Sequence, residues 1–226
     1  EEETRKGEDI EALHDMRVAT RRMRASFEVF GDAFERRALK SHLAGLRQTG
    51  RLLGAVRDLD VFMEKAQTYL DTLPPERRND LEILLHAWHE QRESAREKML
   101  AYLISPEYHT FKREFNIFIH TPGAGRRSLP KDHPAPDLVC EVAPMMIYTR
   151  LAAVRAYGSW LENAPIERLH ALRIEFKKLR YTVEYFREVL GPQAGEVIEE
   201  LKTIQDHLGD MTDAQVAAEI VEKFIA

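Results

Sequence analysis

Basic side chains recur at matched positions 156 residues apart (170 − 14) along this 226-residue chain. A histidine and four cations occupy the same places in both copies of the pattern. The pairs are His14/His170, Arg17/Arg173, Arg21/Lys177, Arg22/Lys178 and Arg24/Arg180. Guanidinium and ammonium groups donate charge-assisted hydrogen bonds to phosphate and carboxylate oxygens. The chemistry that this pattern could perform is therefore anion binding.

A helical wheel separates the basic positions from the apolar ones. At about 100° per residue, positions 14, 17, 21 and 24 fall within roughly 80° of one another. We call His14, Arg17, Arg21 and Arg24 the first basic ridge, and His170, Arg173, Lys177 and Arg180 the second. A separate apolar stripe is expected to pack each helix. Its members are Met16, Met23, Phe27 and Phe30 in one copy and Leu172, Leu179, Val183 and Phe186 in the other.

The alternative for each ridge is a solvated charged face. Such a face usually mixes charges of opposite sign at i, i+4 spacing, which stabilises a helix by about 0.3 kcal/mol per pair. Like charges stand at this spacing in both copies, in Arg17 and Arg21 and again in Arg173 and Lys177. This small cost favours a bound anion over a solvated face.

The elements that position these residues are all predicted to be helices, so the expected fold class is all-α. Helices are expected over 9–30, 33–53, 58–73, 76–104, 106–120, 138–163, 166–189, 193–208 and 211–225. Leu53-Gly54 and Leu208-Gly209 are expected to break the chain between two helices in each half. Asp58 and Asp210 then lie near the caps of the helices that follow. The repeated order indicates an internal duplication.

The expected domain organisation is two helical units joined by a linker. Residues 121–137 contain four of the ten prolines and two glycines, which predicts an exposed linker. The first unit then spans residues 1–120 and the second spans residues 138–226.

The first unit is expected to carry more of the positive charge. Arg36, Lys40, Arg47 and Arg51 share one face of their helix by the same count of about 100° per residue. In the second unit Lys202 matches Arg47, whereas Asp206 stands at the place of Arg51. Thr212 replaces Arg57 in the same way.

The amino-acid composition excludes several classes of protein. With 44% hydrophobic and 31% charged residues, the chain is expected to be soluble and globular. No run approaches the ~20 apolar residues that span a bilayer, so no membrane segment is expected. The single cysteine, Cys140, excludes an intramolecular disulfide, and a cytoplasmic location is expected. The net charge of −5 makes the ridges local patches and disfavours a duplex-DNA reader.

Four motifs in this order resemble a CHAD domain, the conserved histidine α-helical domain. They are His-x-x-Arg-Val-x-x-Arg-Arg-Met-Arg at 14–24, Leu-Gly-x-Val-Arg-Asp-Leu-Asp-Val at 53–61, Leu-His-x-Leu-Arg-Ile-x-x-Lys-Lys-Leu-Arg-Tyr at 169–181 and Leu-Gly-Asp at 208–210. The resemblance implies two pseudo-symmetric antiparallel helical bundles that face a basic central cleft or pore. It also implies non-catalytic binding of inorganic polyphosphate, often at polyphosphate granules.

The residues expected to bind polyphosphate come from both copies. They are His14, Arg17, Arg21, Arg22, Arg24, Lys40, Arg47, Arg51, Arg57, His170, Arg173, Lys177, Lys178, Arg180 and Lys202. No metal site, cofactor, specific nucleic acid or membrane partner is expected, and the oligomeric state stays open.

Two other functions remain open at this point. One is a helical scaffold whose basic faces dock acidic protein partners. The other is an enzyme that processes phosphate compounds and uses His14 and His170. Aspartates at 58, 60, 210 and 213 could be proposed as metal ligands, but helix capping or pairing with a ridge arginine is favoured.

Overall fold

The computed structural model describes residues 1–7, 9–72, 74, 79–128 and 138–225. Within these residues the chain forms nine α-helices and two short 3-10 helices, which confirms the all-α fold class. Their only β-type pairing is an isolated antiparallel bridge between Phe34 and Arg126. The chain divides into two compact units: unit 1 is Glu1–Arg24 with Phe30–Arg127, and unit 2 is Ala25–Val29 with Ser128–Ala226.

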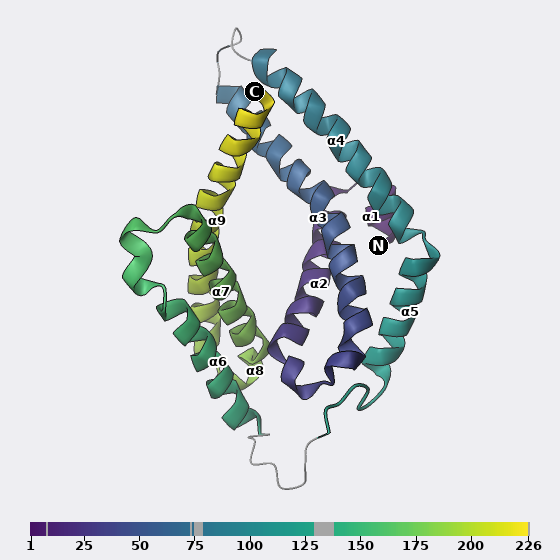
Figure 1. The fold of residues 1–226 in the computed structure, drawn as a ribbon, viewed down its shortest axis with the longest axis vertical. Coiled ribbons are helices and arrows are strands. Elements are labelled where there is room, and N and C mark those ends of the chain that lie inside the picture. The colour runs from purple at the N-terminus through teal and green to yellow at the C-terminus, as the bar shows by residue number, and fades with distance from the viewer. Residues whose placement is uncertain (8, 73, 75–78, 129–137, 226) are drawn as a thin grey trace. The chain divides into compact units, whose positions relative to one another are not determined.

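Unit 1 is built from the first five helices, except for the last five residues of the second helix, Ala25–Val29, which belong to unit 2. The helices are α1 (Glu2–Lys6), α2 (Ile10–Val29), α3 (Arg36–Thr72), α4 (Asn79–Leu103) and α5 (Pro106–His120), with a 3-10 turn at Gly31–Ala33. Leu53, Val56 and Leu103 are fully buried in its core, where α3 packs against α4 (Figure 1). The predicted start of α5 is confirmed, because the Ser105 side chain accepts a hydrogen bond from the Tyr108 backbone N–H at 3.2 Å.

Unit 2 is built around α7. Its helices are α6 (Val139–Arg155), α7 (Ile166–Tyr185), α8 (Arg187–Leu190) and α9 (Gln193–Ile225), with a 3-10 segment at Gly158–Asn163. The helix α7 packs against both α6 and α9. Leu179 and Val183 of α7 meet Ile198 and Leu201 of α9 in the core of this unit. The expected helices at 138–163 and 166–189 are therefore each shorter, and each is followed by a separate short helix.

The predicted breaks at the two Leu-Gly pairs are wrong. Figure 1 shows α3 as one continuous helix, and its 37 residues run through Gly54. Likewise, the 33 residues of α9 run through Gly209. A single glycine in a helix interior costs only about 1 kcal/mol relative to alanine, which the packing of a long helix offsets. Asp58 and Asp210 consequently lie inside helices and cap none.

The first part of the expected linker is fixed to unit 1. The Glu35 backbone N–H donates to the Gly125 carbonyl at 2.8 Å, and the Arg127 N–H donates to the Ala33 carbonyl at 2.9 Å. Gly123 and Gly125 adopt φ angles of 74° and 66°, which a residue with a side chain rarely adopts. Residues 129–137 of the expected linker lie outside the described residues.

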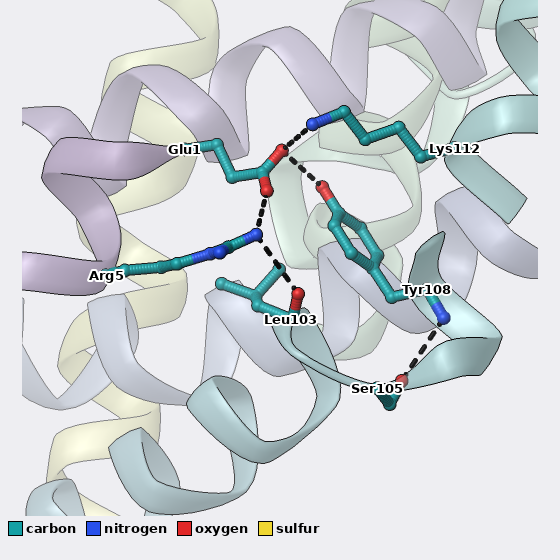
Figure 2. A network of polar contacts seen from close by, with 6 residues as sticks. All are labelled: Glu1, Arg5, Leu103, Ser105, Tyr108 and Lys112. Atoms are coloured by element: carbon teal, nitrogen blue, oxygen red, sulfur yellow. Dashed lines mark hydrogen bonds and ion pairs between the residues drawn. The ribbon is translucent and has the colours of Figure 1, made fainter. Parts of the chain in front are cut away.

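A polar network ties α1 to the corner between α4 and α5 (Figure 2). The Glu1 carboxylate pairs with Arg5 and accepts from the Tyr108 hydroxyl at 3.2 Å and from Lys112 at 2.6 Å. Arg5 also donates to the Leu103 carbonyl at 3.2 Å, at the C-terminal end of α4. Burial raises the pKa of the Tyr108 hydroxyl, and the Glu1 carboxylate raises it further. These contacts fix the start of unit 1 to its core.

Replacement by alanine at two glycines of α3 is expected to change the free energy of unfolding in opposite directions. A Cβ at Gly45 would overlap the ring of Phe111 in α5, whereas a Cβ at Gly50 would lie 3.6 Å from Thr20 Cγ2, an ordinary contact. We expect Gly45→Ala to lower the free energy of unfolding by about 1–2 kcal/mol through overpacking. We expect Gly50→Ala to raise it by up to about 1 kcal/mol through helix propensity. Urea denaturation of both variants measures the difference, and equal shifts would contradict the α3–α5 packing.

Candidate anion-binding surfaces

The first basic ridge lies against α3 at two of its glycines. Arg17 Nη2 donates to Asp58 Oδ1 at 3.2 Å, and Arg17 Nε lies 3.6 Å from the place of a Cβ on Gly54. Arg24 Nη1 lies 3.9 Å from the place of a Cβ on Gly50. Gly50 and Gly54 stand one turn apart, so the two guanidinium groups lie over successive turns of α3.

The other predicted residues of α2 differ in how far they are buried. His14 and Arg21 are half-buried, and Arg22 is exposed on the neighbouring surface. Arg21 Nε is buried and has no hydrogen-bond acceptor among the residues that the structure describes. The apolar-stripe prediction is wrong at Met23, a residue that is 43% exposed.

The helix α3 adds cations beside this ridge. Lys40, Arg47 and Arg51 are exposed on one face, and Arg51 Nη2 donates to Gln48 Oε1 within the same helix at 2.7 Å. By the count of about 100° per residue, Gly54 lies only about 40° from the middle of this face. Gly50, beneath Arg24, lies about 80° from the middle by the same count, and we infer that the ridge arginines border the α3 cations on unit 1. We call Arg17, Arg21, Arg24, Lys40, Arg47 and Arg51 the α2–α3 basic face. Arg57 is half-buried further along α3.

The second basic ridge makes a similar contact with α9. The guanidinium of Arg173 lies against Gly209, where a Cβ would be 3.0 Å from Nη2 and 3.3 Å from Nε. Arg173 Nε is buried and lacks a hydrogen-bond acceptor within the described part of the chain. His170 is exposed and Lys177 is half-buried on the same helix.

Arg180 of the second ridge contacts residues of both α7 and α9. It pairs with Glu184, its Nε donates to Gln205 Oε1 at 2.5 Å, and it lies 4.7 Å from the centroid of the Tyr181 ring. Its side chain is only 16% exposed. The structure thus gives Arg180 internal partners that a bound anion would have to replace or share.

The two remaining predicted cations of unit 2 form pairs within their own helices. Lys178 Nζ lies 2.6 Å from Glu175, and Lys202 Nζ lies 3.7 Å from Glu199. Surface ion pairs at this spacing contribute little, about 0–1 kcal/mol. Lys202, whose side chain is 57% exposed, therefore remains accessible to an external anion, whereas the Lys178 side chain is only 33% exposed.

The two units repeat one contact that the sequence reasoning missed. Arg17 lies over Gly54 in unit 1, and Arg173 lies over Gly209 in unit 2. A second contact is repeated one turn earlier on α3 and on α9. There Arg24 lies near Gly50, and Arg180 donates a hydrogen bond to Gln205. A signal for this contact was present, since Gly50 and Gly54 stand four residues apart in a segment of helix formers.

Two of the four aspartates considered as metal ligands pair with arginine side chains. Asp58 pairs with the ridge residue Arg17, and the buried Asp60 accepts from Arg92 Nε at 2.8 Å. In the described part of the chain no group of three or more histidine, cysteine, aspartate or glutamate residues is arranged to hold a metal ion. Among the described helices, none has the length and apolar character needed to cross a membrane.

The sequence and the fold are similar to those of known proteins. The chain is 26% identical over 223 residues to the uncharacterized proteins MT2285 and Rv2226, from two strains of Mycobacterium tuberculosis. Each match covers 96% of this chain but only 41% of the relative's length. The crystal structure of the CHAD domain from the plant Ricinus communis matches with a TM-score of 0.75 and 20% identity. That match covers 96% of this chain and 69% of the plant chain, and it shows the shared fold.

The family profile accounts for nearly the whole chain. The CHAD domain profile matches residues 1–222, which contain both basic ridges and both Leu-Gly pairs. Since this range covers all but the last four residues of the sequence (226 − 222), the chain belongs to the CHAD domain family.

Proposed function

We propose that this chain binds inorganic polyphosphate without catalysis, through the α2–α3 basic face and the second basic ridge. The CHAD domain family is linked to polyphosphate binding in general. The observation that carries the proposal for this chain is the gathering of cations from two helices on one surface of unit 1. Lys40, Arg47 and Arg51 are exposed there, beside the ridge arginines that lie over Gly50 and Gly54.

The arrangement suits the chemistry of a linear polyphosphate. Such a chain carries about one negative charge per phosphate and offers no base or sugar to recognise. Residues four apart, such as Arg47 and Arg51, are separated by about 6 Å along the helix axis, which provides a ladder of cations. Arginine forks bind phosphate oxygens in pairs, and the release of condensed counterions adds affinity.

The repeated contact between a ridge arginine and a mid-helix glycine supports an internal duplication, with each unit presenting one ridge. That both ridges face a common basic cleft stays a prediction of the family resemblance. We also propose a cytoplasmic location at polyphosphate granules, where the ligand would be concentrated.

Titration with four ligands at two salt concentrations tests the proposed function. Long-chain polyphosphate is expected to bind more tightly than orthophosphate, ATP or single-stranded DNA. If about six cations contact the ligand, log Kd should change with log salt concentration with a slope of about 4. DNA binding as tightly as polyphosphate of equal charge would show an unselective basic surface. Release of orthophosphate from polyphosphate would support the enzyme, and tighter binding of an acidic protein would support the scaffold.

A further inference from the structure

Gly54 and Gly209 lie where a glycine is unfavourable. Both are in the interior of long helices, where alanine is the better helix former. Neither has a positive φ angle, so the backbone does not require glycine at these positions. The space that a side chain would take is the remaining reason for a glycine.

At Gly209 that space is filled by the guanidinium of Arg173. Three of its atoms lie close to the place of a Cβ: Nη2 at 3.0 Å, Cζ at 3.4 Å and Nε at 3.3 Å. At Gly54 the corresponding atoms of Arg17 are further away, with Nε at 3.6 Å and Nη2 at 3.9 Å. The contact in unit 2 is therefore the tighter of the two.

The two arginines also differ in their hydrogen bonds. Arg17 donates to Asp58, whereas Arg173 Nε is buried without an acceptor among the described residues. We infer that this close packing against Gly209 restricts the orientation of the Arg173 guanidinium before a ligand arrives. Because an ordered donor loses less conformational entropy on binding, this contact should strengthen the binding of an anion.

We propose that Gly209 is a positioning residue for anion binding. Because it has no side chain, the guanidinium of Arg173 can pack against α9 at this position. The proposal rests on the proposed polyphosphate function for its ligand, but the packing of Arg173 against Gly209 is a property of the free protein. A side chain at position 209 would occupy the place of the guanidinium and release Arg173 into other rotamers.

The central test is a double-mutant cycle with Gly209→Leu and Arg173→Gln, read as affinity for long-chain polyphosphate. Each single variant is expected to weaken binding about fivefold, the loss of one charged contact with the ligand. The double variant should show no further loss, because Gly209 acts through Arg173. The matched control is Gly195→Leu on the same helix, where a Cβ would meet only Arg187 Nη2, at 3.8 Å. The control should leave affinity unchanged.

A measurement on the free protein tests the packing of Arg173 against Gly209 independently of the proposed polyphosphate function. In the free protein the buried Arg173 Nε–H should give an NMR signal that exchanges slowly with water, assigned by its absence in Arg173→Lys. Gly209→Leu should abolish this protection, and Gly195→Leu should preserve it. If the wild-type protein does not bind polyphosphate, the proposed function is wrong, but the NMR comparison still tests the contact between Arg173 and Gly209.

Three results would contradict the proposal that Gly209 positions Arg173. They are wild-type affinity in a folded Gly209→Leu variant, additional loss in the double variant, and unchanged Nε–H protection. If circular dichroism shows that Gly209→Leu does not fold, Gly209→Ala replaces it. Alanine should shift the Arg173 Nε–H signal and weaken binding about twofold, because its Cβ lies at the limit of contact. An unchanged signal and affinity in that variant would reject the proposal.

Discussion

Reversing the charge of Arg47 and Arg51 together, by substitution with glutamate, is expected to weaken polyphosphate binding about 30-fold at low salt. Each reversal removes an attractive contact and adds a repulsive one, for a combined loss of about 2 kcal/mol. The salt dependence should also become shallower, with a slope lower by about 1–2. Both residues are exposed, and Arg51 bonds only to Gln48 of its own helix among the contacts described. Stability should therefore change little, which circular dichroism would verify.

The same charge reversal at Arg126 and Arg127 is the matched control. These residues are exposed on the segment that follows α5, and they belong to neither basic ridge. The pairing of this segment with Phe34 and Ala33 uses the backbone, so the side chains can be changed without loss of its hydrogen bonds. We expect a loss of less than about threefold from the change in net charge. Equal losses in the two double variants would mean that diffuse charge, rather than a built surface, binds the ligand.

Asp60→Asn is expected to destabilise unit 1 by about 3 kcal/mol. The Asp60 side chain is 6% exposed and pairs with Arg92, whose side chain is 18% exposed. Burial alone would lower the pKa of the Arg92 guanidinium, but hydrogen bonds to Asp60 and Glu93 outweigh burial and raise it. Without the aspartate charge, Arg92 would remain largely buried with Glu93 as its remaining carboxylate partner. Urea denaturation followed by circular dichroism measures the loss.

Asp58→Asn, two residues earlier on the same helix, is the control for this effect. Asp58 is 61% exposed in its pair with Arg17, so its removal should cost less than about 1 kcal/mol. The same substitution removes a carboxylate that competes with an external anion for Arg17. Polyphosphate binding should therefore become modestly tighter in Asp58→Asn. Similar destabilisation by both variants would contradict the difference in burial between the two ion pairs.

The amino-acid sequence by itself determined the helical class and the positions of the cations. Apolar periodicity of about 3.6 residues identifies helices because it follows from local geometry. The Ser105 cap was also predictable, since the serine side chain satisfies a backbone donor of its own helix. The recurrence of His14 and Arg17 as His170 and Arg173 needed only the order of residues along the chain.

Only the tertiary structure decided what the glycines and the charged side chains contact. Gly54 and Gly209 resembled helix breaks because their local propensity is low, but packing of α3 and α9 offsets that cost. Equally, sequence spacing placed Arg180 on the second ridge but could not show its bond to Gln205 on α9. A contact between helices depends on how their surfaces meet, which is set by packing across the whole unit. For this reason the ridges could be predicted from sequence, and the partners of each arginine could not.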